Sequence, residues 1–220
     1  MYGIEYQFHV KSYAMTEKPD LLTNRPESLR EADAVDLLSE QLDAVHLSGG
    51  VFFRAELSAP FCLESPSCEQ IADLLELGPR RVVPFHVISL GNAEARVDGL
   101  EPVLLETGDV VVFLHDGSHV MASPGACGPT PIDSHLPPPP YHGVHSVRCG
   151  GGGAVTLAIC GFLYHDRSTF NPLLDMLPSV LKVSTEARVR DARLSKILRL
   201  IEDEVSESRP GGASLLTRLT

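Results

Sequence analysis

The chain has 220 residues, of which 43 % are hydrophobic and 21 % are charged, values typical of an ordinary folded protein. This length predicts one domain with appendages or two small domains. Asp and Glu outnumber Lys and Arg by 29 to 18, which gives a formal net charge of −11. So acidic a chain is a poor polyphosphate binder, and if it acts on DNA, we expect the DNA-contacting part to lie outside these residues.

Localisation signals are absent from the sequence pattern. No run of about 18 consecutive apolar residues occurs, so we expect no transmembrane helix. The first ten residues have neither a basic start nor a long apolar block, which argues against a signal peptide. The five cysteines are an odd number without zinc-type spacing, which fits reduced thiols in a cytoplasm.

The N-terminal part contains two candidate elements. Alternation of apolar and polar residues over 2–10 predicts a strand, and 11–26 has the composition of a linker, with Met15 as an alternative start. An apolar face at helical spacing predicts a helix over 33–47, ended by a pair of glycines. We therefore take 1–32 as an N-terminal extension.

The middle of the chain consists of short apolar segments separated by turn residues, which is typical of a β-rich domain. For residues 64–79 the sequence pattern does not decide between a helical turn and a loop. A long proline-rich loop is expected over 122–143, and 150–153 is either a hairpin tip or a flexible connection. Strands are expected over 51–57, 61–63, 82–89, 93–97, 102–105, 110–114, 118–121, 144–147 and 154–164.

The C-terminal part is expected to be helical. A short helical segment opens at Pro172, and Ser184 or Thr185 caps a longer helix. A further helical period begins at Ser214 and stops at Thr220, so we expect the chain to be cut within an element. The apolar face of the longer helix is Leu194, Ile197, Leu198, Ile201 and Val205.

Two histidines lie in segments with a recognisable pattern. His119 follows a Gly108-Asp109 turn and an apolar strand, which resembles the second cupin motif, where a histidine points into a barrel. His86 lies in segment 85–88, which with the glycines and charged residues of 91–99 resembles the first cupin motif.

The order of these motifs resembles, more narrowly, the N-terminal cupin-type ligand-binding domain of AraC-type transcription regulators. The resemblance implies a double-stranded β-helix, or jelly-roll barrel, over 33–180 and a helical linker used for dimerisation over 181–220. The DNA-binding domain of that family, with two helix-turn-helix units, is not in this chain. The similar segments are 47–53, the two cupin motifs, 150–153, 160–162, 166–167, 171–174 and 177–178.

A metal site is a second implication of the resemblance. Metal cupins usually supply two histidines and a carboxylate from the first motif and one histidine from the second, a set that suits Zn, Fe, Ni or Mn. His86 and His119 match, but Ile88 and Asn92 occupy the other two positions, and Glu94 substitutes only with a shift along the strand. Two alternatives stay open: a divalent metal at His86 and His119, or two barrel-lining histidines that hydrogen-bond a ligand.

The motifs and the resemblance together suggest three functions. The leading one is a small-molecule-sensing domain of an AraC-type regulator that forms a homodimer through its C-terminal helices, has no catalytic residue and reaches DNA only through a domain absent here. The alternatives are a metal-dependent cupin enzyme, a dioxygenase or isomerase using His86 and His119, and a stand-alone interaction protein. The expected effector site comprises Phe53, Phe61, Phe85, His86 and His119.

Overall fold

The computed structural model describes residues 48–49, 53–114, 116–126, 128–137, 144–166, 174, 176–184, 192–207, 212 and 216. All of them lie in one compact unit, Asp43–Thr220. The strand expected over 2–10 and the helix expected over 33–47 lie outside the described residues, and so does the final helical period apart from Leu216.

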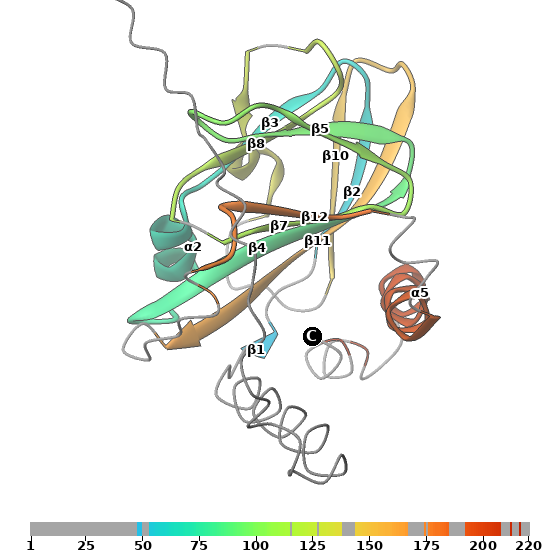
Figure 1. Cartoon of the computed structure of the whole chain (residues 1–220). Coiled ribbons are helices and arrows are strands. Elements are labelled where there is room, and N and C mark those ends of the chain that lie inside the picture. Colours follow the sequence, from blue (N-terminus) through green and yellow to red (C-terminus); the bar gives the residue numbers. More distant parts are fainter. Residues whose placement is uncertain are drawn as a thin grey trace, which may run out of the picture. The chain divides into compact units, whose positions relative to one another are not determined.

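Strands make up more of the described chain than helices do, and they form two sheets (Figure 1). The seven-stranded sheet has the order β10-β2-β11-β4-β7-β12, with β1 paired to β11, and the five-stranded sheet has the order β6-β5-β8-β3-β9. Their bounds are β1 Ser48–Gly49, β2 Phe53–Ser58, β3 Cys62–Ser65, β4 Arg80–Leu90, β5 Asn92–Arg96, β6 Val103–Glu106, β7 Val110–Phe113, β8 His119–Ala122, β9 Thr130–Pro131, β10 His145–Gly150, β11 Val155–Asp166 and β12 Val180–Val183.

The two sheets pack face to face, and alternate residues of their strands fill the space between them. Successive side chains of a strand point to opposite faces, so each strand contributes every second residue to this core. The prediction of a mainly β fold of the jelly-roll type is thereby confirmed. The core between the sheets contains Ala55, Leu57, Phe61, Leu63, Ile88, Ala93, Ala95, Leu105, Val111, Phe113, Met121 and Ala158.

In the described part of the chain, the sheets are accompanied by the α-helices α2 (Cys68–Leu74) and α5 (Ala192–Glu207) and by the 3-10 helix η1 (Ile132–His135). Helix α2 settles the ambiguity over 64–79. It begins at the N-cap Ser67, whose side chain accepts from the Gln70 backbone N–H while the Gln70 side chain accepts from the Ser67 backbone N–H. Its buried Cys68 and Ile71 pack against Val82 of β4. None of the described helices is long and apolar enough to cross a membrane.

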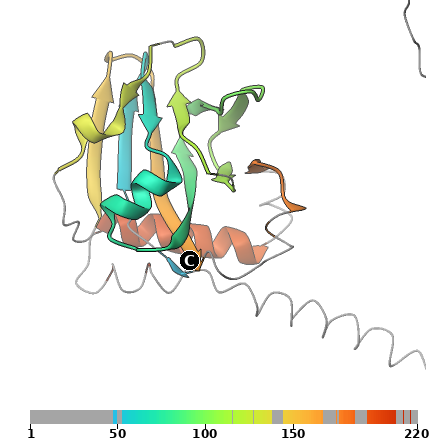
Figure 2. The ribbon, with the colours of Figure 1, turned by 90° about the vertical axis from the view of Figure 1, so that its left-hand side faces the viewer.

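Helix α5 covers the outer face of the seven-stranded sheet. Leu198, Ile201 and Val205 are buried on one side of the helix, where they join a cluster with Phe85 and Val87 of β4. Figure 2 shows α5 running across the strands of this sheet. Strand β4 is therefore covered on both faces, and seven consecutive residues, Val82 to Ile88, are buried.

The structure rules out one of the two alternatives for the connection over 150–153 and adds short elements to the loop expected over 122–143. Residues 150–153 do not form a hairpin tip, because β2 lies between β10 and β11 and pairs with both. The backbone N–H groups of Gly151 and Gly153 instead donate to the carbonyls of Ser58 and Ala59 as the chain crosses over β2. The long loop over 122–143 likewise holds two short elements, β9 and η1.

The C-terminal part is not entirely helical. Residues 180–183 form β12, which pairs antiparallel with β7 at the edge of the large sheet. Four residues are too few for a period to distinguish a strand from a helix, so the sequence pattern missed it. The Lys182 ammonium anchors β12 to the turn before β7, since it pairs with the Asp109 carboxylate at 2.9 Å.

The turn before β7 depends on a glycine. Gly108 has φ 92°, in the region that side chains disfavour, and its backbone N–H donates to the Ile88 carbonyl at 2.7 Å. Asp109 is buried and accepts from the Glu106 backbone N–H at 2.8 Å. The carboxylate of Asp109 therefore stabilises a turn, as its position in the Gly108-Asp109 pair before an apolar strand predicts.

Replacing Gly108 tests this turn. We expect Gly108→Val to destabilise the fold by about 1–3 kcal/mol, because a β-branched residue is strained at positive φ. Urea unfolding measures the change. Gly108→Asn is the matched control and should cost less, since Asn tolerates positive φ better than Val does. Equal stability of the Val variant and the unaltered protein would contradict the role given to this turn.

Candidate functional site

A cavity of about 80 Å³ lies between the two sheets, and nearly all of its lining surface is apolar. Strands β2, β3, β4, β8, β10 and β11 form its walls, and side chains of α2 and η1 reach it from outside the sheets. Its lining residues are Phe53, Ala55, Leu57, Leu63, Ser65, Pro66, Ile71, Leu74, Leu75, His86, His119, Met121, Ile132, Asp133, Leu136, Val147, Ala158, Cys160 and Phe162.

Two histidines on different sheets meet at this cavity. His86 comes from β4 in the large sheet and His119 from β8 in the small one, and their Nε2 atoms are 2.8 Å apart. Both side chains are buried, with 8 % and 3 % of their surface exposed. At this distance one Nε2–H donates to the other Nε2, so the bond joins the two sheets across the apolar core.

Phe113 of β7 fixes the orientation of the pair. Its ring stacks on His119 with centroids 3.8 Å apart and an interplanar angle of 16°. It meets His86 edge-on, at 5.7 Å and 72°. An aromatic ring against both imidazoles restricts their rotation, so the two Nε2 atoms are held facing one another.

Burial keeps both imidazoles neutral. Desolvation lowers the pKa of His86 from 6.5 to about 4. Desolvation, and then repulsion by His86, lower the pKa of His119 well below its usual value. A neutral imidazole carries one proton, so one ring holds it on Nε2 and the other on Nδ1. Neither Nδ1 atom has a hydrogen-bond partner among the described residues, so a buried donor and a buried acceptor stay unsatisfied.

The residues around the pair do not fit a metal ion. No three His, Cys, Asp or Glu side chains lie together in the described part of the chain. Ile88 belongs to the apolar core, and the Glu94 carboxylate lies 2.6 Å from the Arg96 guanidinium on β5, whose inward residues are alanines. An ion bound to both Nε2 atoms at the usual 2.0–2.1 Å would subtend an angle of about 85°, far from tetrahedral. We derive no metal-dependent step from this pair.

Three of the five residues expected at the effector site line the cavity: Phe53, His86 and His119. Phe61 is buried in the core between the sheets but does not line the cavity. Phe85 lies on the opposite face of β4 and packs under α5. Neighbours on a strand point in opposite directions, so Phe85 and His86 cannot both face the cavity, and placing Phe85 there was wrong.

Sequence reasoning missed the contribution of β11. Cys160 lies directly opposite His86 in the register of β11 and β4 and lines the cavity with Ala158. Burial raises the pKa of the Cys160 thiol to about 12, so it stays protonated. Both faces of β11 are largely apolar, which hides the period of two that would have marked its inward residues.

The buried histidines predict a loss of stability in mild acid. The unfolded chain binds protons at its histidines near pH 6.5, whereas folded His86 does so only near pH 4. The stability that neutral His86 contributes is present above pH 6.5 and is lost as the pH falls toward 4, amounting to about 2 kcal/mol at pH 5.

Urea unfolding at pH 7 and pH 5 measures this loss. The double variant His86→Phe, His119→Phe keeps apolar rings at both positions and cannot bind the protons, so it should lose less stability between the two pH values. The carboxylates titrate in both proteins and cancel in the comparison. Equal losses would show that these histidines are not buried neutral.

Comparison with known proteins agrees with the geometry. Residues 36–220, most of the chain, match the family model described as Cupin. No curated protein matches the sequence. Two packed β-sheets with an apolar cavity between them, and two histidines from the positions of the two cupin motifs at that cavity, accord with this match. The chain belongs to the cupin family.

Proposed function

We propose that this chain is the small-molecule-sensing and dimerising part of an AraC-type transcription regulator. The ordered motifs of the sequence support the regulator, and the cupin match supports a barrel with a ligand site inside it. The observation that carries the proposal is the double role of β4, which lines the cavity with one face and supports α5 with the other.

Adjacent residues of β4 serve the two faces. His86 reaches the cavity, and its neighbours Phe85 and Val87 pack against α5. No further layer separates the cavity from the helix at this strand. A ligand that displaces His86 therefore moves the backbone on which α5 rests, and it shifts the position of the helix if it binds one arrangement more tightly than the other.

Strand β11 makes the link between the cavity and α5 more rigid. Gly161 lies opposite Phe85 in the register, and a Cβ on Gly161 would overlap the Phe85 ring. The ring thus fits closely over the backbone of β11, while Ile159 of the same strand joins the cluster under α5. Close packing of this kind transmits small displacements, because the interior has no free space to absorb them.

The outward side of α5 offers a surface for a second copy. Ile197 and Leu200 are three residues apart and leave 42 % and 43 % of their surface exposed. Residues at this spacing lie side by side on a helix, so they form one apolar strip. We propose that this strip pairs with α5 of another chain, and that the DNA-binding domain of such a regulator acts outside these residues.

A binding screen tests the sensing role. A library of small metabolites is scanned by thermal shift, and each stabilising compound is then followed by sedimentation velocity. We expect at least one compound that raises Tm and changes the dimer dissociation constant. A chain that stays monomeric at high concentration and is stabilised by no compound would overturn the proposal.

Substitution of the apolar strip tests the dimer. The double variant Ile197→Glu, Leu200→Glu places two carboxylates on the proposed interface and should weaken the dimer about tenfold or more, because charges there lose hydration without a partner. Both positions are exposed, so the midpoint of urea unfolding extrapolated to low protein concentration should hardly change. Sedimentation equilibrium measures the dissociation constant.

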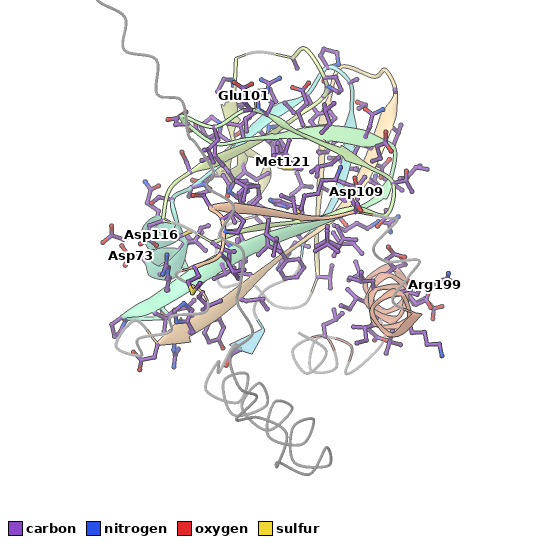
Figure 3. The ribbon with its side chains drawn as sticks, viewed as in Figure 1. Asp73, Glu101, Asp109, Asp116, Met121 and Arg199 are labelled. Carbon is purple, nitrogen blue, oxygen red and sulfur yellow. The ribbon has the colours of Figure 1, made fainter. Side chains whose placement is uncertain are left out.

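Arg199→Glu is the matched control, since it changes the net charge by the same two units. Arg199 is exposed and lies on the side of α5 turned away from the sheets in Figure 3. It should weaken the dimer much less. Equal weakening by both variants would mean that charge alone, and not this strip, governs association.

Elemental analysis separates the sensor from the metal-dependent enzyme. Stoichiometric metal in the purified protein that is lost in His86→Ala would favour a cupin enzyme, a dioxygenase or isomerase. Metal-free protein that responds to a small molecule would favour the sensor.

A further inference from the structure

The polarity of the cavity restricts what it can bind. Nearly all of its lining surface is apolar, and among the described residues that line it the facing Nε2 atoms of His86 and His119 form the one buried side-chain hydrogen bond. A hydroxyl buried without a partner is strongly disfavoured, so a sugar with several hydroxyls would lose far more than it gained. The occupant is therefore mainly apolar.

The cavity also restricts the charge of its occupant. Both histidines are buried and neutral, so neither offers a positive charge to an anion. Asp133, the one acidic residue in the lining, lies on η1, and the lining contains neither Lys nor Arg. An ion moved from water into such surroundings is strongly disfavoured, so the occupant is uncharged.

The histidine pair is a matched donor and acceptor. One Nε2 presents a proton and the other a lone pair, and at present they satisfy one another. A hydroxyl is the smallest functional group that replaces both partners. Its oxygen accepts a hydrogen bond from one Nε2–H, and its O–H donates a hydrogen bond to the other Nε2. A carbonyl or an ether only accepts and would leave one Nε2 unpaired.

We propose that the cavity binds a small, uncharged, largely apolar molecule that carries a single hydroxyl group inserted between His86 and His119. The inference rests on the proposed function, because it takes this cavity as the effector site. The volume of about 80 Å³ is roughly half that of an apolar cavity that holds benzene in another protein. A hydroxyl inserted between the two Nε2 atoms, which now lie 2.8 Å apart, must separate them and so widen the cavity as it binds. The occupant is then at most one ring, a simple phenol, or a short branched alcohol.

Methionine methyl groups provide the probe. Met121 lines the cavity and lies between the sheets (Figure 3), whereas Met176 is 84 % exposed. In protein labelled with methyl-13C methionine, phenol and toluene should both shift the Met121 signal and leave the Met176 signal in place. Benzoate and a pentose sugar should shift neither.

Phenol and toluene differ only by a hydroxyl in place of a methyl group, so their relative affinity reports the hydrogen bond. We expect phenol to bind at least as tightly as toluene. In His119→Phe, which retains an aromatic ring against Phe113, the ratio of the two dissociation constants should move by about tenfold in favour of toluene. Anisole, which cannot donate, should bind more weakly than phenol in the unaltered protein and so checks the same bond if the variant does not fold.

The outcomes separate this inference from the proposed function. A Met121 shift with the pentose or benzoate, and not with phenol, overturns the apolar hydroxyl ligand but leaves a ligand-binding barrel. No Met121 shift with any probe overturns the inference, as does toluene binding more tightly than phenol in the unaltered protein. If phenol binds as expected and the dimer dissociation constant stays unchanged, the inference stands and the regulatory role loses its support.

Discussion

The structure depends on the burial of β4 on both faces. A strand at the surface of a two-sheet domain normally leaves one face to solvent, but here seven consecutive residues are buried. One face closes the cavity with His86, and the other anchors α5 through Phe85 and Val87. Pairing with β11 on one side and β7 on the other fixes the register, so neither face can change without the other.

The hydrogen bond between His86 and His119 is a costly interaction in this setting. It joins the two sheets through an apolar core and leaves two Nδ1 atoms without partners among the described residues. Two apolar side chains of the same shape would give a more stable core, because no polar atom would be desolvated. A polar pair retained at the wall of a cavity, and held in place by Phe113, is therefore easier to explain by binding than by stability.

The sequence predicted the strands well where their ends carry turn residues, as at 82–89 and 110–114, which the structure has as β4 and β7. It missed β12, because four residues show no clear period, and it placed Phe85 in the cavity against the alternation of its own strand. Motif spacing identified His86 and His119. It could not give their 2.8 Å contact, because contacts across two sheets depend on how the sheets pack, which local patterns do not encode.

Two departures from the metal-binding pattern of cupins explain why the cavity is mostly apolar and its histidines are uncharged. Ile88 stands where a second histidine would be, and it lies fully buried in the apolar core. Asn92 stands at the acidic position and is exposed at the start of β5. With both donors absent, the two histidines pair with each other and have no third His, Cys, Asp or Glu beside them in the described part of the chain, so they stay neutral in apolar surroundings. Recognition at this site then depends on shape and on one shared proton, which favours an uncharged ligand over an anionic one.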